Sequence, residues 1–240
     1  MTRPALRIAI VGAESTGKST LATALAQRLG ELSGRRCTAV GEWLRTWCEQ
    51  QGRTPLPQEQ RAVAEHQQAL IDAACADHDI VVCDTTALMT SVYSDLLFAD
   101  RSLEAYAMAQ QGRCDITLLT ALDIEWQADG LQRDGPQVRP PVDARVRHLL
   151  MADRLPWALV SGQGQARLES ALDAVTPLLR ERGLLGPGLF TRLSQRDAQD
   201  LAQSAAWTWR CDDCEVPDCE HALLRAASHP QLLPADLTRR

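Results

Sequence analysis

Residues 12–20 read Gly-Ala-Glu-Ser-Thr-Gly-Lys-Ser-Thr, in the form G-x-x-x-x-G-K-[S/T] of the phosphate-binding P-loop. The apolar run at residues 8–11 comes directly before this loop and is typical of a buried strand. Leu21, Leu25 and Leu29 follow it at helical spacing. A strand before and a helix after are the context that the motif requires. The stretch therefore predicts a strand–loop–helix unit rather than a chance glycine-rich turn before a helix.

The side chains of this loop suit a nucleoside triphosphate. Glycines let the backbone curl around phosphate oxygens, and the N–H groups of the loop and of the helix N-terminus point at the anion. Lys18 is suited to reach the β- and γ-phosphates, and the Ser19 hydroxyl to ligate Mg²⁺. Lys18 is also the single lysine among the 25 lysines and arginines, and a compact ammonium suits a phosphate. The predicted ATP-binding residues are Gly12, Glu14, Ser15, Thr16, Gly17, Lys18, Ser19 and Thr20.

The composition is ordinary for a globular protein. Of the 240 residues, 45% are hydrophobic and 23% are charged, and the net charge of −6 comes without a basic block, so general nucleic-acid binding is not indicated. No apolar run reaches the roughly 18–20 residues of a membrane span. The first residues lead almost directly into the first strand, from which we expect no signal peptide and a cytoplasmic location. The sequence does not indicate an oligomeric state.

Apolar segments alternate with segments of helical periodicity, which predicts an α/β domain with a parallel sheet covered on both faces. We expect a P-loop kinase-type sheet of five strands in residues 1–182, then a linker and a small cysteine-rich tail in residues 183–240. The expected strands are residues 7–12, 37–40, 80–84, 115–120 and 157–162. The expected helices are residues 18–30, a segment beginning near 42, and residues 57–76, 87–98, 102–111, 142–154 and 164–182.

Asp84 closes the apolar strand at residues 80–84, at the edge of a parallel sheet where ligands bind. A carboxylate there is placed to hold the Mg²⁺ shell or to accept a proton from an attacking hydroxyl. The alternative is a cap for the helix at residues 87–98, which Thr85 or Thr86 would provide equally well. We therefore predict a catalytic and Mg²⁺-binding role for Asp84.

Two further segments carry charged side chains that suit a kinase. Glu42 and Arg45 are three residues apart and share a helix face. They form either a surface ion pair or a substrate clamp, in which Glu42 binds sugar hydroxyls and Arg45 a phosphate or carboxamide. Residues 123–141 are polar and rich in Asp, Arg, Gly and Pro, which predicts a mobile lid. Arg133 and Arg139 on this lid are predicted to supply positive charge to the transferred phosphoryl group, the alternative being solvated surface arginines.

Several motifs in the same order resemble the nicotinamide riboside kinase domain of the NadR-like family, over about residues 7–180. They are the P-loop at 12–20 with Glu as its third residue, and Glu-Trp-Leu-Arg at 42–45. Cys-Asp-Thr-Thr at 83–86 with Tyr-Ser-Asp-Leu-Leu-Phe at 93–98, and Trp-Gln-Ala-Asp-Gly-Leu-Gln-Arg at 126–133, complete the set. Thr86 stands where the family has a second Asp.

The resemblance implies transfer of phosphate from ATP and Mg²⁺ to the ribose 5′-hydroxyl of nicotinamide riboside, giving the mononucleotide. The acceptor residues that it implies are Glu42, Trp43, Arg45, Tyr93, Trp126 and Asp129. The rings of Trp43, Tyr93 and Trp126 are suited to stack on a flat base. The alternative is that each is an ordinary half-buried aromatic.

The last 50 residues contain a cluster of metal-ligand type, C-x₂-C-x₄-C-x-H. Cys211, Cys214, Cys219 and His221 would hold one tetrahedral zinc ion in a knuckle at residues 211–221. An iron–sulfur cluster, or three reduced cysteines without metal, are the alternatives. Four protein ligands leave no open position, so the predicted zinc is structural.

A second class of function also fits the sequence. The protein would then be a P-loop regulatory ATPase that acts through a partner bound by the C-terminal tail. A GTPase switch is disfavoured, because the guanine-reading N/T-K-x-D motif needs a lysine and Lys18 is the only one. A degenerate kinase fold kept as a binding module is the third hypothesis, which Thr86 and the extra tail support.

The zinc prediction is tested by Cys214→Ser. We expect this substitution to release bound metal without removing ATP binding, because the ligand set lies outside the P-loop domain. Metal content and ATP binding of protein purified without chelator are the measurements. Absence of stoichiometric metal from the unsubstituted protein would remove the zinc prediction.

Overall fold

The computed structural model describes residues 4–127 and 135–184. Its centre is a five-stranded sheet in the order β2-β3-β1-β4-β5, in which every neighbouring pair is parallel. The strands are β1 (Leu6–Val11), β2 (Cys37–Val40), β3 (Ile80–Asp84), β4 (Ile116–Thr120) and β5 (Trp157–Val160). The predicted five-stranded parallel sheet is confirmed. The P-loop follows β1, the central strand, so it lies in the middle of the sheet's carboxyl edge.

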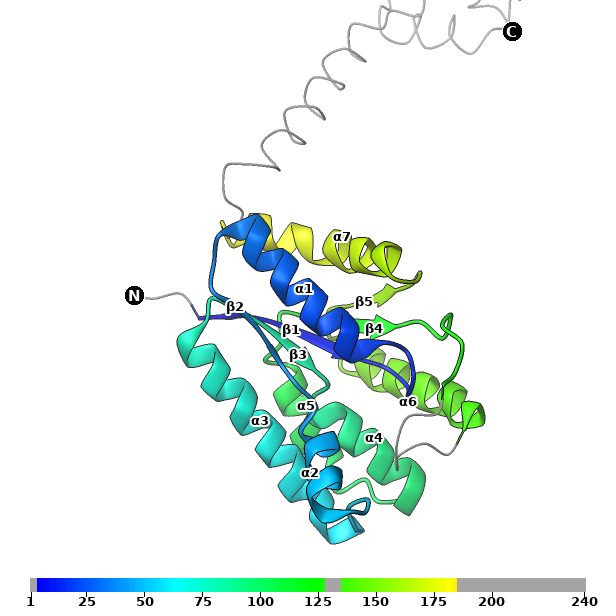
Figure 1. Ribbon diagram of the computed structural model, residues 1–240. Coiled ribbons are helices and arrows are strands. Elements are labelled where there is room, and N and C mark those ends of the chain that lie inside the picture. The colour runs from blue at the N-terminus through cyan, green and yellow to red at the C-terminus, as the bar shows by residue number, and fades with distance from the viewer. Residues whose placement is uncertain (1–3, 128–134, 185–240) are drawn as a thin grey trace, which may run out of the picture. The chain divides into compact units, whose positions relative to one another are not determined.

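Helices cover both faces of this sheet (Figure 1). One face carries α1 (Lys18–Ser33) and α7 (Gln165–Glu181), which pack on each other. The other face carries α3 (Gln60–Asp77), α4 (Ala87–Phe98), α5 (Glu104–Gln111) and α6 (Arg139–Ala152). The nine-residue α2 (Trp43–Gln51) packs against α3, and short 3₁₀ turns, η1 (Pro57–Glu59) and η3 (Pro136–Val138), precede α3 and α6.

The strands are apolar on both sides because both faces of the sheet are covered. Every residue of β3 and β4 is buried, as is all of β1 except Arg7. One core cluster joins β1 to α1 and α7, through residues such as Ile8, Leu25 and Val175. A second joins the opposite face to α4 and α6, with Leu88 and Val146 among its members. Packing on both faces thus holds the sheet in place, and with it the carboxyl edge where the P-loop lies.

The start of α6 differs from the sequence prediction. From its composition we expected a mobile segment over residues 123–141, with a helix over about 142–154. Instead, α6 begins at Arg139, and Pro140 and Pro141 lie in its first turn. Proline is tolerated there because the first N–H groups of a helix have no intrahelical partner. Arg139 is therefore the first residue of α6, three residues before the predicted start of this helix.

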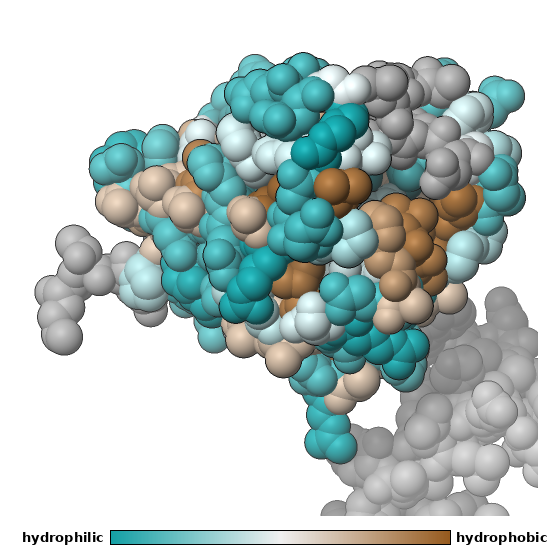
Figure 2. Space-filling view, turned by 90° about the horizontal axis from the view of Figure 1, so that it is seen from below, coloured by the Kyte–Doolittle hydropathy of each residue, from teal (hydrophilic) through white to brown (hydrophobic). Residues whose placement is uncertain are grey.

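On the face that Figure 2 shows, most of the described surface is hydrophilic, and hydrophobic side chains gather in separate patches. The exposed large hydrophobic residues include Leu96, Leu97 and Phe98 at the end of α4. Among the helices of residues 4–127 and 135–184, none has both the length and the apolar character that crossing a bilayer requires.

Candidate functional site

The loop between β1 and α1 has the backbone of an anion cradle. Three of its residues have positive φ: Gly12 at 145°, Ser15 at 54° and Gly17 at 74°. Gly17 is the N-cap residue of α1, and no side chain caps the helix. The N–H groups at the start of a helix lack intrahelical partners. These donors are therefore directed at whatever the loop surrounds, and an anion is the ligand that they suit.

Thr120, at the end of β4, is in close contact with the P-loop. A Cβ on Gly12 would lie 2.2 Å from Thr120 Oγ1, so only glycine fits this close approach. Thr120 Oγ1 donates to Val11 O at 3.2 Å and lies 2.7 Å from Thr16 Oγ1. Thr16 Oγ1 in turn donates to Ala13 O at 2.8 Å. Both hydroxyls are fully buried, and they tie the loop to the strand that neighbours β1.

Lys18 is folded back onto its own loop. Its Nζ donates to Ala13 O at 2.9 Å, which places the ammonium over the space that the loop surrounds. In this position the charge lies among the N–H donors of the P-loop, where a phosphate oxygen would replace the carbonyl as the partner of Lys18.

A buried arginine that the sequence prediction missed also holds the loop. Arg167 on α7 is 3% exposed. It donates to Gly162 O at 2.8 Å, to Thr16 O at 3.1 Å and to Asp123 Oδ1. Asp123 also accepts from Gly162 N at 2.6 Å. Burial lowers the pKa of Arg167 and the charge of Asp123 opposes this. The guanidinium thus connects the P-loop to the segments after β4 and β5.

Asp84 lies beside the P-loop at the end of β3, in register with Ile10 of β1. The residue is 3% exposed, and its Oδ1 is buried with no hydrogen-bond partner among the described residues. Leaving a carboxylate oxygen buried and unsatisfied is costly. A hydrated Mg²⁺ ion or a substrate hydroxyl would satisfy it, so the position fits the role that the sequence predicts.

Thr86 rather than Asp84 caps α4. Its Oγ1 accepts from Leu88 N at 3.3 Å and donates to Gln111 Oε1 at 2.6 Å. Gln111 Nε2 donates to Thr117 Oγ1 at 2.7 Å. Thr86 therefore belongs to a buried network between α4, α5 and β4, and the capping alternative for Asp84 does not apply.

A cavity of about 860 Å³ extends from the P-loop toward α2 and α4. Its polar end contains Glu14, Ser15, Lys18 and Thr85. The wall from α2 and the segment after it contributes Glu42, Leu44, Arg45, Cys48, Glu49, Thr54, Pro55 and Gln60. The opposite wall contributes Met89, Tyr93, Leu96, Leu97, Phe98, Val138, Pro141 and Val142. The cavity lining is thus polar at the P-loop and along much of the α2 side, and largely apolar on the side formed by α4 and α6.

The predicted acceptor residues are only partly brought together. Glu42, Arg45 and Tyr93 line the cavity, and Arg45 Nε lies 3.9 Å from Glu42 Oε2. Trp43 is not among the lining residues, because its ring stacks on His66 with centroids 3.9 Å apart. Trp126 is half-buried and is also not part of the lining. Of the three predicted stacking aromatics, Tyr93 alone lines the cavity.

The predicted lid is described only in part. Asp129 and Arg133 lie outside the described residues. Arg139 is 6% exposed and its Nη1 donates to Ile124 O at 2.8 Å, close to the P-loop, since Ile124 approaches Gly17. Its Nε and Nη2 are buried with no hydrogen-bond partner in the part of the chain that the structure describes. Arg139 is thus a buried cation with two available donors.

The zinc prediction is not tested by the structure. Cys211, Cys214, Cys219 and His221 lie outside the described residues. Within residues 4–127 and 135–184, no group of three or more His, Cys, Asp or Glu side chains is arranged to hold a metal ion.

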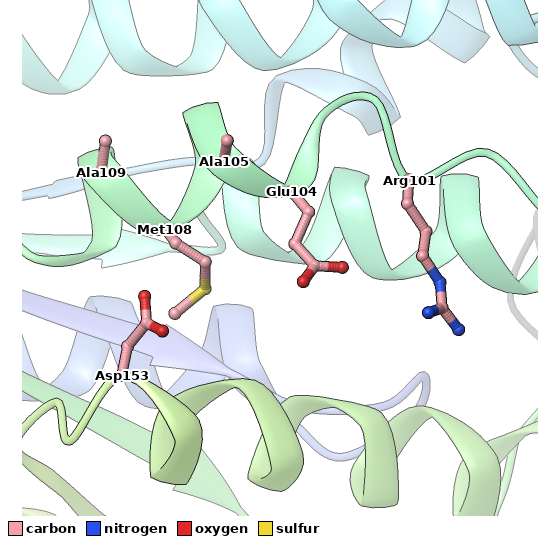
Figure 3. Close-up of a pocket in the computed structure, with 6 residues that line it drawn as sticks. All are labelled: Arg101, Glu104, Ala105, Met108, Ala109 and Asp153. Carbon is pink, nitrogen blue, oxygen red and sulfur yellow. The ribbon is translucent and has the colours of Figure 1, made fainter.

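A second hollow, of about 520 Å³, lies between α5 and the end of α6 (Figure 3). Arg101 and Glu104 point into it from the α5 side, and Asp153 faces Met108 across it. Arg101 is paired with Asp95 at 2.9 Å, and Glu104 with Arg145 at 2.5 Å. These charges already have protein partners, and no P-loop residue lines the hollow. The larger cavity is therefore the candidate site.

Comparison with known proteins assigns the family. The family model AAA_28, described as an AAA domain, matches residues 7–167. The chain belongs to the AAA_28 family. The match spans the P-loop, Asp84, the cavity walls and Arg167, so the whole candidate site lies within the family domain. A search of curated proteins found no match.

Solved structures with a similar fold include two of NadR. One, in complex with NR, has 20% identity and a TM-score of 0.59, and the match covers 72% of this chain and 50% of that chain. The other, in complex with NAD and AMP-PNP, has 19% identity and a TM-score of 0.57, with 72% and 49% covered. This member of the AAA_28 family therefore spans about half the length of these structures. Its resemblance to NadR is confirmed at the level of the P-loop kinase fold.

The P-loop geometry is tested by Gly12→Ala. A methyl group would meet Thr120 Oγ1 at 2.2 Å in a backbone with φ of 145°, so the loop must shift. We expect ATP affinity to fall at least tenfold, because misplaced donors lose their hydrogen bonds to phosphate. Titration calorimetry measures the affinity. Gly112→Ala, whose added methyl group makes only ordinary contacts, is the control, and equal affinities for both variants would contradict the assigned loop geometry.

Proposed function

We propose that the protein is an ATP-dependent nucleoside kinase that phosphorylates the ribose 5′-hydroxyl of nicotinamide riboside to give nicotinamide mononucleotide. The observation that carries this proposal is that one cavity is lined both by P-loop residues and by Glu42, Arg45 and Tyr93. A kinase needs a second substrate beside the γ-phosphate, and a cavity of this size is large enough for a nucleoside. An ATPase that transfers phosphate to water needs no such space.

The phosphate side of the cavity has the charges that phosphoryl transfer requires. The P-loop backbone and Lys18 would bind the β- and γ-phosphates of ATP. Arg139, whose buried Nε and Nη2 lack hydrogen-bond partners in the described residues, would supply further positive charge to the same anion. Donors fixed before the reaction stabilise the charge that develops on the equatorial oxygens.

Mg²⁺ fits this site because Asp84 Oδ1 is buried without a protein partner in the described residues. Ser19 and Asp84 would hold the ion, which neutralises phosphate charge when it is bound. The alternative role for Asp84 is to accept the proton of the attacking hydroxyl. Both roles use the oxygen that the protein leaves unsatisfied.

The acceptor side suits a nucleoside. Glu42 would accept hydrogen bonds from ribose hydroxyls, and Arg45 would donate to a polar substituent such as a carboxamide. Tyr93 and the apolar residues Leu96, Leu97 and Phe98 provide contacts for a flat base. The polar residues of the P-loop and α2 and the apolar residues of α4 match the two halves of such a molecule.

The choice of nicotinamide riboside rests on the motifs at residues 12–20, 42–45 and 83–98 and on the fold shared with NadR, one structure of which is a complex with NR. Thr86 replaces an acid of that pattern and is engaged in the core with Gln111. Ribose recognition in this protein would therefore fall to Glu42 and Asp84. We propose in addition that residues 211–221 bind a structural zinc ion.

The experiment that tests the proposal measures ADP release with Mg·ATP, with and without nicotinamide riboside, and with other nucleosides as controls. Strong stimulation by nicotinamide riboside supports the proposal. Slow turnover that no nucleoside stimulates would favour a regulatory ATPase acting through the C-terminal tail.

The role of Lys18 is tested by Lys18→Ala. Turnover is expected to fall at least a hundredfold, because one donor to the transferred phosphoryl group is worth roughly 3 kcal/mol. The fold should persist, since Thr120 and Arg167 also hold the P-loop. Arg28→Ala on the same helix, where Arg28 pairs with Glu31 at the surface, is the control. Near-normal turnover by the Lys18 variant would defeat the P-loop assignment.

A further inference from the structure

Glu42 lies where β2 passes into α2, and its backbone is held there by a side chain from another helix. Glu42 is the N-cap residue of α2, with extended backbone (φ −71°, ψ 109°), but its side chain makes no capping hydrogen bond. A side chain at this position commonly satisfies one of the first N–H groups of its helix. Here the carboxylate lines the cavity instead.

Gln67 on α3 replaces the missing cap. Its Oε1 accepts from Trp43 N at 2.7 Å, and its Nε2 donates to Gly41 O at 3.2 Å. One amide therefore binds the residue before Glu42 and the residue after it. Gln67 is 3% exposed, and an amide is suited to this task because it offers one acceptor and donors together. A carboxylate in its place would face the Gly41 carbonyl without a proton to donate.

The neighbouring ring contact adds to this support. Trp43 stacks on His66, the residue before Gln67, with an interplanar angle of 25°. The first turn of α2 is thus fixed on α3 through a backbone hydrogen bond and a ring stack at adjacent positions. Both contacts leave the Glu42 side chain facing the cavity.

We infer that Gln67 is a positioning residue that fixes Glu42 for recognition of the acceptor. This inference rests on the proposed function, because it assigns Glu42 to the acceptor rather than to ATP. Since Gln67 contacts backbone on both sides of Glu42, its loss lets the carboxylate move relative to the P-loop. A displacement of this kind weakens acceptor binding, while the P-loop, which is held by Thr120 and Arg167, is unaffected.

The test is Gln67→Met, which keeps the length of the side chain and removes both hydrogen bonds. We expect the KM for nicotinamide riboside to rise roughly tenfold, because a displaced Glu42 carboxylate makes weaker hydrogen bonds to the acceptor, while the KM for ATP stays unchanged. The matched control is Gln68→Met. Gln68 is the next residue, is 7% exposed, and donates within α3 to Asp72 at 3.2 Å, so its loss should leave both KM values unchanged.

A double-mutant cycle with Glu42→Gln separates positioning from general destabilisation. If Gln67 acts through Glu42, Gln67→Met changes the acceptor KM little once Glu42 is replaced, so the two effects are not additive. Should Gln67→Met fail to fold, Gln67→Glu serves instead. It keeps the oxygen that accepts from Trp43 but loses the donor to Gly41, and a higher acceptor KM is again expected.

Four results would overturn the inference. An acceptor KM that is the same in the Gln67 and Gln68 variants would show that the amide does not position Glu42. A KM for ATP that rises as much as that for the acceptor, or full additivity with Glu42→Gln, would show a purely structural role. If the unsubstituted protein phosphorylates no nucleoside, both the proposed function and the inference fail. If it is active but the Gln67 variant has an unaltered acceptor KM, the inference alone fails.

Discussion

The structure depends on the close contact between the P-loop and the end of β4. Gly12 has no side chain because Thr120 occupies the space that a Cβ would need, and the Thr120 hydroxyl lies within hydrogen-bonding distance of Thr16 in the same loop. This contact joins the loop to a strand more than a hundred residues away in sequence. Arg167 on α7 reinforces it, because its guanidinium reaches the Thr16 carbonyl. The donors of the loop are therefore fixed before any phosphate arrives.

The P-loop donors on one side of the cavity are fixed, so we expect the side formed by α2 and α4 to be the part of the site that varies with the substrate. The wall from α4 is held by Thr86 at its start and by the Arg145–Asp95 pair near its end, at 2.8 Å. The wall from α2 is short and depends on α3 for its position, through Gln67 and His66. Substrate choice would accordingly be set by residues of α2 and α4, while nucleotide binding is set by the sheet.

Much of the fold could be predicted from the sequence because its signals are local. The helix at residues 87–98 matches its predicted bounds, since Thr86 caps it within two residues, and the strand at 37–40 also matches. The predicted start of α6 was wrong, because a sequence does not distinguish a proline that breaks a helix from one in its first turn, where Pro140 and Pro141 lie. Arg167 and Gln67 could not be found this way, because each acts on a backbone segment that is distant in sequence. Trp43 was expected to face the substrate, but no local pattern reveals that His66 takes its ring.

The central claim is that one cavity binds both ATP and a nucleoside acceptor, and identification of the phosphorylated product tests it most directly. The purified protein is incubated with Mg·ATP labelled in the γ-phosphate and with nicotinamide riboside, and the products are separated and identified by mass spectrometry. The account predicts that the label appears in nicotinamide mononucleotide in equal amount to the ADP formed. Label found only in inorganic phosphate, with nicotinamide riboside recovered intact, would contradict it.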